Sequence, residues 1–326
     1  MKKISKIAVL SSGGDAPGMN AAIRSVVRAA IFHGLEVEGI EHGYEGMIKA
    51  EFVKLKSKNV RNIIQRGGTI LRTARSEEFK TEEGRQKAYD NLVKRKIDAV
   101  IVIGGDGTFR GAGIFSQEFD IPFVGIPGTI DNDMFGTDFT IGFDTALNTV
   151  VEAIDRIKDT ASSHDRMFFI EVMGRDAGFI ALQAGIATGA EAILIPEIEG
   201  QAEKLKEYLL NESKSKKSSS IILVAEGNNL GGAVEVANKV KDDFKDFNVR
   251  VNVLGHMQRG GTPTAFDRFL ASRLGVAAVD ALLDNQRSVM VGYKNHEVVH
   301  VPFNKTIKGN RDISNELLRV ADILTI

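Results

Sequence analysis

The stretch AVIVIGGDGT, residues 99–108, decides the fold class of this 326-residue chain. Its first half is an unbroken run of apolar, mostly β-branched residues, which is typical of a strand buried on both faces of a parallel sheet. Its second half is a glycine-rich turn, and the pattern beyond it predicts a helix from about Thr108. A buried strand that passes through a glycine turn into a helix is the repeating unit of α/β folds, which bind ligands at the carboxyl ends of their strands.

The same strand–turn–helix unit occurs twice more. Strand 7–10 leads into SSGGDAPG, residues 11–18, and strand 167–173 leads into GRDAG, residues 174–178. The repeated alternation predicts two doubly wound, mainly parallel α/β/α sandwich domains with the active site in the cleft between them. Further strands are predicted at 36–40, 123–126, 192–195, 221–225 and 249–254, and helices at 17–33, 82–96, 145–161, 177–187 and 264–283.

The domain boundaries are predicted from this topology, because no linker of distinct composition marks them. We expect a larger domain made of residues 1–140 and about 252–302, and a smaller one made of about 141–251 and 303–326. The last residues, 302–326, are predicted to leave a strand and form a helix.

Composition excludes several classes of protein. The formal net charge of -1 gives no electrostatic footprint for nucleic acid or an anionic membrane. The chain has no Cys, which excludes disulfides, thiolate zinc sites and a cysteine nucleophile. The basic first residues lead directly into a strand without the apolar stretch of a signal peptide, and the longest uncharged run near the middle, 177–190, is too short to span a bilayer. We therefore expect a cytoplasmic protein that binds neither nucleic acid nor membrane.

The glycine turns predict phosphate binding. Glycine lets the backbone approach a ligand closely, and the helix that follows offers free N–H groups and the positive end of its dipole. One such turn is often a tight turn without a ligand, whereas three at equivalent strand ends favour an anion site. Asp106 lies inside the second turn and would repel phosphate unless a cation such as Mg²⁺ stands between them. The chain has no Walker motif and is one residue off a dinucleotide fingerprint, so a nucleoside triphosphate with Mg²⁺ is favoured over NAD.

An acidic turn follows another buried strand. The stretch GIPGTIDND, residues 125–133, ends with two carboxylates two residues apart. A kinase needs a base for the acceptor hydroxyl and groups that neutralise charge on the transferred phosphoryl group. Asp131 and Asp133 are candidates for the base and for tuning the metal, Thr129 can orient either partner, and Arg175 can stabilise the phosphoryl charge.

A group of cationic residues lies near the ends of two later strands. His256 and Arg259 belong to HMQRGG, residues 256–261, while Arg250 lies within the preceding strand and Arg166 precedes strand 167–173. Any one of these arginines could be an exposed surface charge at a strand end that binds no ligand. Together with His256 they form a candidate clamp for a phosphate already present on the substrate, because Arg binds phosphate bidentately. The chemistry thus predicted joins ATP and a phosphorylated sugar.

These motifs resemble those of the bacterial ATP-dependent 6-phosphofructokinases over nearly the whole chain, least after about Gln286. GGDGT alone is shared with other kinases, whereas PGTIDND (127–133), MGR (173–175) and GHMQRGG (255–261) are specific. The resemblance implies ATP-dependent phosphorylation of fructose 6-phosphate at its 1-hydroxyl, giving fructose 1,6-bisphosphate and ADP in the committed step of glycolysis. Pyrophosphate-using relatives place Asp at the position of Gly107 and Lys at that of Gly128, so the resemblance favours ATP as the donor.

The resemblance also implies a role for each matching residue. Asp131 is the expected base, Asp133 and Thr129 support it, and Asp106 is expected to hold Mg²⁺. The expected ATP contacts are Gly14, Arg75, Ser76, Gly105, Asp106, Gly107 and Thr108, with Arg75 bridging the two substrates. The expected fructose 6-phosphate contacts are Thr129, Ile130, Asp131, Arg166, Met173, Gly174, Arg175, Glu226, Arg250, His256, Met257, Gln258 and Arg259.

The family resemblance further implies a homotetramer, in which Arg166 and Arg250 reach the active site from a neighbouring subunit, and an effector site for ADP or phosphoenolpyruvate. The expected effector residues are Arg24, Arg28, Lys158, Gly189, Glu191, Ser215, Lys217 and Ser219. Lys158 replaces a usual Arg, Ser215 a usual basic residue and Ser219 a usual His. Because Ser carries no charge and Lys lacks the planar fork of Arg, we expect a weakened allosteric response.

Two other interpretations stay open on the sequence. An NAD or lipid kinase could use the same GGDGT turn, but it would not need the cationic clamp. A non-catalytic nucleotide-binding subunit should have lost Asp131, Asp106 or Arg175, and all three are present.

Overall fold

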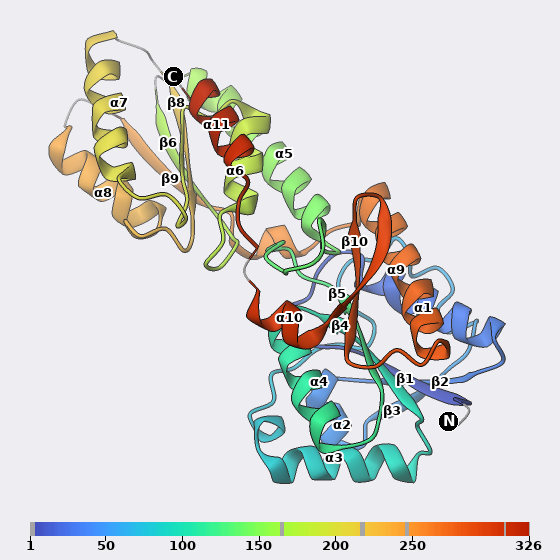
Figure 1. The fold of residues 1–326 in the computed structure, drawn as a ribbon. Coiled ribbons are helices and arrows are strands. Elements are labelled where there is room, and N and C mark those ends of the chain that lie inside the picture. Colours follow the sequence, from blue (N-terminus) through green and yellow to red (C-terminus); the bar gives the residue numbers. More distant parts are fainter. Residues whose placement is uncertain (1–3, 164–165, 216–218, 245–247, 310, 326) are drawn as a thin grey trace. The chain divides into compact units, whose positions relative to one another are not determined.

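The computed structural model describes residues 4–163, 166–215, 219–244, 248–309 and 311–325. The chain forms two compact units (Figure 1). Unit 1 comprises Met1–Thr145 and Arg259–Arg311, and unit 2 comprises Ala146–Gln258 and Asp312–Ile326. None of the helices in the described ranges combines the length and the apolar character needed to cross a membrane.

Unit 1 is built on a sheet of seven described strands in the order β11-β10-β5-β4-β1-β2-β3. The five central strands pair in parallel, while β3 and β11 pair antiparallel at the two edges. The sequence order reverses between the adjacent strands β1 and β4, and such a switch point is where open α/β sheets bind ligands. The strand bounds are β1 Lys6–Ser11, β2 Glu36–Ile40, β3 Phe52–Leu55, β4 Ala99–Gly104, β5 Phe123–Pro127, β10 Val289–Lys294 and β11 Glu297–Pro302.

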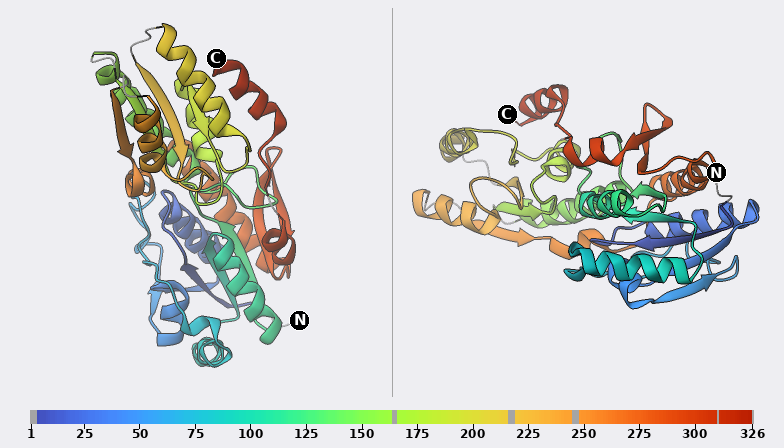
Figure 2. Two further views of the ribbon diagram at one scale, coloured as in Figure 1. Left: turned by 90° about the vertical axis from the view of Figure 1, so that its left-hand side faces the viewer. Right: turned by 60° about the horizontal axis from the view of Figure 1, so that its bottom comes forward.

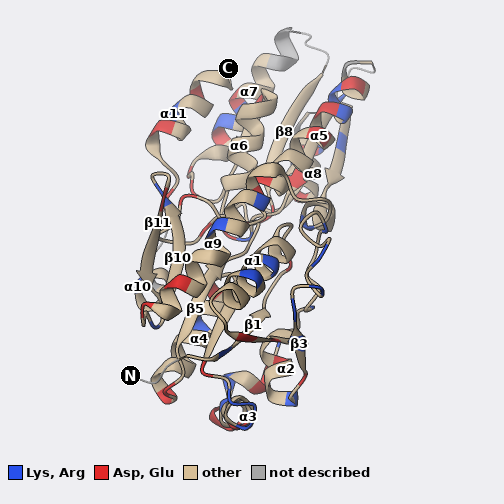
Figure 3. Cartoon of the chain, turned by 90° about the vertical axis from the view of Figure 1, so that its right-hand side faces the viewer, with Lys and Arg blue, Asp and Glu red and all other residues tan. Residues whose placement is uncertain are grey.

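Helices cover both faces of this sheet (Figure 2). Helices α1 (Met19–Phe32) and α9 (Ala265–Leu283) pack together on one face, whereas α2 (Gly43–Lys49), α4 (Asp106–Glu118) and α10 (Phe303–Lys308) cover the other. Helix α3 (Glu82–Lys94) packs on α2 and on the short helix η1 (Glu78–Lys80), and it carries both basic and acidic residues (Figure 3). The strands are apolar on both sides because both faces are buried.

The unit boundary near the C-terminus differs from the expected one. Residues 303–309 and Arg311 belong to unit 1, although the sequence placed them in the smaller domain. The physical reason is packing, since the ring of Phe303 is 2% exposed and stacks on Phe109 of α4 with 5.2 Å between ring centroids. The chain therefore passes back to unit 2 only after Arg311.

Unit 2 contains a parallel sheet of four described strands in the order β7-β8-β6-β9. The strands are β6 Met167–Val172, β7 Ala192–Leu194, β8 Ser220–Ala225 and β9 Val249–Val253. Leu205 and Leu209 of α7 and Val236 and Ala237 of α8 pack with buried residues of the sheet. The remaining elements are α5 Phe143–Ser162, α6 Phe179–Thr188, α7 Gln201–Ser215, α8 Ala233–Asp243, η2 Gly255–Arg259 and α11 Asn315–Leu324, of which α11 packs on α6.

A buried carboxylate holds the start of α5. Asp267 accepts hydrogen bonds from the backbone N–H groups of Gly142 and Thr145, each at 2.8 Å, and from the Thr145 hydroxyl at 2.5 Å. These donors would otherwise be unpaired at a helix N-terminus. Burial raises the pKa of the Asp267 carboxyl to about 6, although the three hydrogen bonds act in the opposite direction.

This shifted pKa gives stability a specific pH dependence. The folded state holds the Asp267 proton more tightly than the unfolded state, so this group's contribution to stability falls as pH rises from about 4 to about 6. We expect Asp267→Asn to be less stable than the wild type, because its amide group faces N–H donors. The stability difference should shrink by about 1 kcal/mol as the pH rises from about 5 to about 6, because the folded carboxyl loses its proton over that range. Urea unfolding at about pH 5 and about pH 6 tests this. The control is Asp284→Asn, at the exposed residue that directly follows the same helix, and an unchanged difference would contradict the prediction.

Candidate active site

The first two glycine turns lie side by side at the carboxyl ends of β1 and β4. The Thr108 hydroxyl donates to the carbonyl oxygen of Ser12 at 3.0 Å, so the second turn is tied to the first. A Cβ at Gly104 would collide with both that oxygen and the Thr108 hydroxyl, so glycine is required there. The first two glycine turns are therefore neighbours within unit 1.

The second turn opens helix α4, which begins at Asp106. The unpaired N–H groups of this helix end suit the phosphates of a nucleotide. The Asp106 side chain is 40% exposed and forms an ion pair with Arg110 at 3.2 Å. An accessible carboxylate at a turn expected to bind phosphate fits Mg²⁺, which usually takes one or two carboxylates together with phosphate oxygens.

The acidic turn after β5 lies against the same helix end. A Cβ at Gly105 would be 3.6 Å from Cβ of Thr129, which places the predicted base and the predicted phosphate site within one region of unit 1. The backbone N–H of Asp131 donates to the Thr129 hydroxyl oxygen at 3.2 Å. Asp131 and Ile130 are buried, and Asp133 is half-buried.

A buried asparagine that the sequence analysis did not single out shapes this turn. Asn132 has a left-handed backbone with φ of 55° and no exposed surface. Its side-chain oxygen accepts from the backbone N–H of Thr140 at 2.9 Å, and the Thr140 hydroxyl donates to the carbonyl oxygen of Thr129 at 2.6 Å. Asn tolerates the left-handed region better than most residues. This preference was the one sequence signal that could have identified Asn132 as a residue that shapes the turn.

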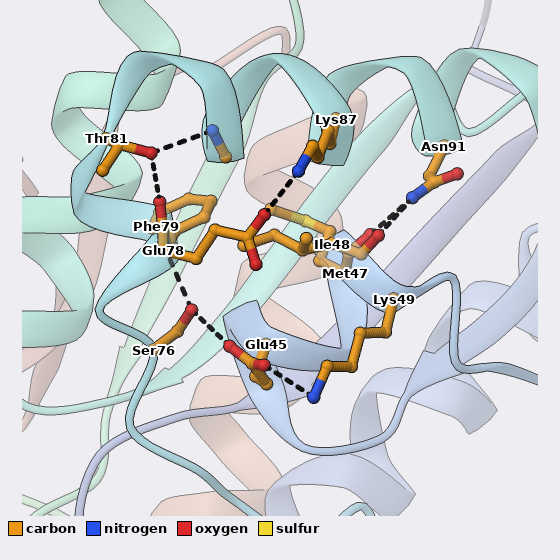
Figure 4. A network of polar contacts seen from close by, with 11 residues as sticks. Glu45, Met47, Ile48, Lys49, Ser76, Glu78, Phe79, Thr81, Lys87 and Asn91 are labelled. Atoms are coloured by element: carbon orange, nitrogen blue, oxygen red, sulfur yellow. Dashed lines mark hydrogen bonds and ion pairs between the residues drawn. The ribbon is translucent and has the colours of Figure 1, made fainter.

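The loop that carries Arg75 and Ser76 is anchored through Ser76 (Figure 4). The Ser76 hydroxyl donates to Glu45 at 2.6 Å and accepts from the backbone N–H of Phe79 at 3.2 Å. Hydrogen bonds from Lys49 and then from Ser76 lower the pKa of the Glu45 carboxyl. Ser76 is thus engaged with protein groups, whereas the neighbouring Arg75 is exposed.

Arg259 lies beside the first glycine turn. Its guanidinium donates to the carbonyl oxygen of Asp15 at 3.2 Å, and a Cβ at Gly14 would be 2.7 Å from it. Arg259, which the sequence analysis grouped with the sugar-phosphate residues, thus lies next to Gly14, an expected ATP contact. The remaining members of the cationic clamp belong to unit 2.

In unit 2, the third glycine turn is fixed by Glu226 at the end of β8. One Glu226 carboxylate oxygen accepts from the backbone N–H groups of Gly174 at 3.2 Å and Arg175 at 2.7 Å. Arg175 has a left-handed backbone with φ of 53°, and a Cβ at Gly227 would collide with its carbonyl oxygen. Glu226 therefore acts on the backbone of the Arg175 turn, and the Arg175 side chain extends from a constrained position.

The β9 end contributes Gln258, Met257 and His256 to the same edge of the sheet. Gln258 is fully buried, and its side-chain oxygen accepts from the backbone N–H of Met173 at 3.2 Å. Its amide nitrogen donates to the carbonyl oxygen of Gly255 at 3.0 Å. Gln258 is thus an internal link between the ends of β6 and β9, while His256 and Met257 are exposed.

Arg166 and Arg250 lie at the opposite end of this sheet. Arg250 pairs in register with Phe168 near the start of β6, and Arg166 immediately precedes β6. Arg175, by contrast, follows the far end of β6. At about 3.3 Å per strand residue, roughly 20 Å separates the two ends. One copy of unit 2 therefore does not bring these two arginines together with Arg175.

The expected effector residues are divided between the units. Arg24 and Arg28 lie on α1 in unit 1, and the pKa of Arg24 is lowered by burial and then by Arg28. In unit 2, the Lys158 ammonium donates to the carbonyl oxygens of Thr188 and Gly189, which is favourable at the C-terminus of α6. Glu191 accepts from the backbone N–H of Ile221 at 2.7 Å, Ser219 is described and half-buried, and Lys217 and the Ser215 side chain lie outside the described residues.

Comparisons with known proteins show which family this chain belongs to. A family model described as phosphofructokinase matches residues 6–282. The chain is 56% identical to ATP-dependent 6-phosphofructokinase 2 of Bacteroides thetaiotaomicron over 100% of both chains, and 56% identical to ATP-dependent 6-phosphofructokinase 1 of Thermus thermophilus over 98% of this chain and 99% of the relative. The structure of phosphofructokinase from Saccharomyces cerevisiae matches with a TM-score of 0.88 and 38% identity over 99% of this chain, which spans 48% of that longer chain. This chain belongs to the phosphofructokinase family.

Proposed function

We propose that this chain is an ATP-dependent 6-phosphofructokinase, a glycolytic enzyme that transfers the γ-phosphoryl group of ATP to the 1-hydroxyl of fructose 6-phosphate. The observation that carries the proposal is the contact between the Gly105–Thr108 turn and the Thr129–Asp133 turn in unit 1. A phosphate-binding helix end and a buried carboxylate in one region are what phosphoryl transfer to a hydroxyl needs. The relatives that share 56% identity over nearly their full lengths are named for this activity.

In the proposed mechanism, Asp131 takes the proton from the 1-hydroxyl as the oxygen attacks the γ-phosphorus. Thr129 and Asp133 hold Asp131, and the Thr129 hydroxyl accepts from its backbone. Asp106 would hold Mg²⁺, which would supply positive charge to the triphosphate. Arg175 stabilises the charge that develops on the phosphoryl group. Arg75 and the Gly105–Thr108 turn bind ATP.

The phosphate of fructose 6-phosphate is assigned to His256, Arg259 and two arginines from a second subunit. Within one unit 2, Arg166 and Arg250 lie at the strand ends opposite to Arg175. This separation favours an assembly in which a neighbouring copy supplies them, as in the homotetramer that the family resemblance implies. Met173, Gly174 and Glu226 bind the sugar, and Gln258 supports them from the interior.

The donor is the first point to test. Initial rates with fructose 6-phosphate and Mg²⁺ are measured with ATP and then with pyrophosphate. We expect activity with ATP alone. Activity with pyrophosphate only would overturn the proposed donor, and no transfer with either donor would favour one of the other kinases that use a GGDGT turn.

Gly107 offers a sharper test of the donor. It is exposed in the first turn of α4, and a Cβ there would meet nothing within 4 Å, so substitutions leave the fold intact. We expect Gly107→Asp to raise the KM for ATP about tenfold, because a carboxylate repels the triphosphate across this turn. Gly107→Ala adds the same Cβ without charge and should change the KM little. Equal effects of the two substitutions would argue against a triphosphate at this turn.

We further propose a cytoplasmic enzyme with a reduced response to ADP and phosphoenolpyruvate. The Lys158 ammonium is engaged by the end of α6, which leaves it less available to an anionic effector than a free cation would be. Rates measured with and without each compound test this, and strong activation by ADP would contradict it.

A further inference from the structure

Arg311 is the last residue of unit 1 before the chain returns to unit 2. Its guanidinium donates one hydrogen bond to the carbonyl oxygen of Asn132 at 2.8 Å and another to that of Asp138 at 2.7 Å. The side chain is partly buried. A planar guanidinium with donors in a fixed fork can join two such oxygens at once, which an ammonium cannot do in the same geometry.

The two carbonyl groups belong to the segment that carries the acidic turn. Asn132 stands between Asp131 and Asp133, and its left-handed backbone makes the turn's shape depend on this one residue. The side chain of Asn132 is already tied to Thr140, so Arg311 holds the same residue from its backbone oxygen. Rotation of the peptide after Asn132 would redirect the carboxylates on both sides of it.

We propose that Arg311 is a positioning residue for phosphoryl transfer: by holding the carbonyl groups of Asn132 and Asp138, it fixes the orientation of the Asp131 carboxylate. The inference rests on the proposed role of Asp131 as the base. Arg311 does not have to touch either substrate in this role. It acts through the backbone of the acidic turn.

The positive charge of Arg311 is stabilised by two nearby carboxylates, although the side chain is partly buried. Burial lowers its pKa, and the carboxylates of Asp138 and Asp133 act in the opposite direction. Because a guanidinium stays protonated at any physiological pH, the two donors are always available.

The test compares Arg311→Gln and Arg311→Lys with the wild type in the fructose 6-phosphate reaction. We expect Arg311→Gln to lower kcat by about tenfold to a hundredfold, since small misplacements of a catalytic group have effects of this size. The KM for ATP should stay within about threefold, because the nucleotide turns at β1 and β4 make no use of Arg311. Arg311→Lys should recover part of kcat, since it restores one donor. It also serves as the folded variant if Arg311→Gln does not fold.

Lys6→Gln is the matched control. Lys6 is also a cation that donates to a main-chain carbonyl group, that of Arg95 at 3.0 Å, and it pairs with Glu38 at 2.6 Å. It lies in unit 1 at the start of β1, the strand end away from the glycine turns. We expect this substitution to lower Tm and to leave kcat unchanged. A kcat loss in the Arg311 variants no larger than in Lys6→Gln would overturn the proposal.

Hydrogen exchange separates this proposal from the proposed reaction. In Arg311→Gln, the amides of residues 129–133 should exchange faster than in the wild type, while those of β1 should not change. This readout needs no activity, so it decides the role of Arg311 even if the wild type does not phosphorylate fructose 6-phosphate. Unchanged exchange at 129–133 would overturn the proposal whatever the reaction is.

Discussion

Replacing Asp131 by Asn is expected to lower kcat by about a hundredfold to ten-thousandfold, the range that a general base contributes. Asn keeps the shape of the side chain and the backbone hydrogen bond to Thr129, but it cannot accept a proton. The KM for fructose 6-phosphate should change by no more than a few fold, because the phosphate clamp is elsewhere. Steady-state kinetics with saturating ATP measure both quantities.

Asp133→Asn is the matched control for this prediction. Asp133 lies two residues away in the same turn, and its carboxylate is half-buried. It supports the base without taking the proton, so its loss in kcat should be clearly smaller. Near-normal turnover in Asp131→Asn would exclude Asp131 as the base.

Replacing Arg175 by Ala is expected to lower kcat by about a hundredfold to a thousandfold, as does removal of one donor that stabilises transition-state charge. The loss should fall on kcat rather than on the KM for fructose 6-phosphate, because the charge develops only during transfer. Arg175→Lys should retain part of the activity. Lys keeps the charge but lacks the fork that binds phosphate bidentately.

The backbone around Arg175 makes this comparison interpretable. Ala and Lys both meet the same left-handed φ of 53°, so strain is similar in the two variants. Two hydrogen bonds from the turn to Glu226 do not involve the Arg175 side chain and are kept. A rise in KM without a fall in kcat would show that Arg175 binds the sugar phosphate rather than the transferred group.

The sequence predicted the central strands and the positions of the glycine-rich turns well, for a local physical reason. A buried parallel strand must be apolar on both sides, and the turn after it needs glycine, so Ala99–Thr108 carries both signals within ten residues. The α/β class and the strands β1, β2, β4, β5 and β6 are confirmed. Edge strand β3, the β10–β11 hairpin and helices α2, α7 and α8 were not predicted, because they are short or polar on one side and depend on the sheets that they cover.

Parts of the candidate site could not be predicted because they depend on contacts between residues distant in sequence. Arg311 binds the acidic turn across 179 residues, and Arg259 reaches the first glycine turn across 244. Phe303 joins the core of unit 1 by stacking on Phe109. The observed boundary of unit 1 therefore lies at Arg311 rather than at the predicted residue 302. No local pattern specifies such pairs. Gln258 was also not predicted as an internal residue, because its sequence motif does not indicate that its side-chain amide is buried.

The most direct measurement follows the phosphoryl group itself. The enzyme is incubated with Mg²⁺, fructose 6-phosphate and ATP that carries a label in its γ-phosphoryl group, and the sugar product is identified by phosphorus NMR. The account predicts fructose 1,6-bisphosphate with the label at carbon 1 and one ADP formed for each bisphosphate. Label released only as inorganic phosphate, or found on any other acceptor, would contradict it.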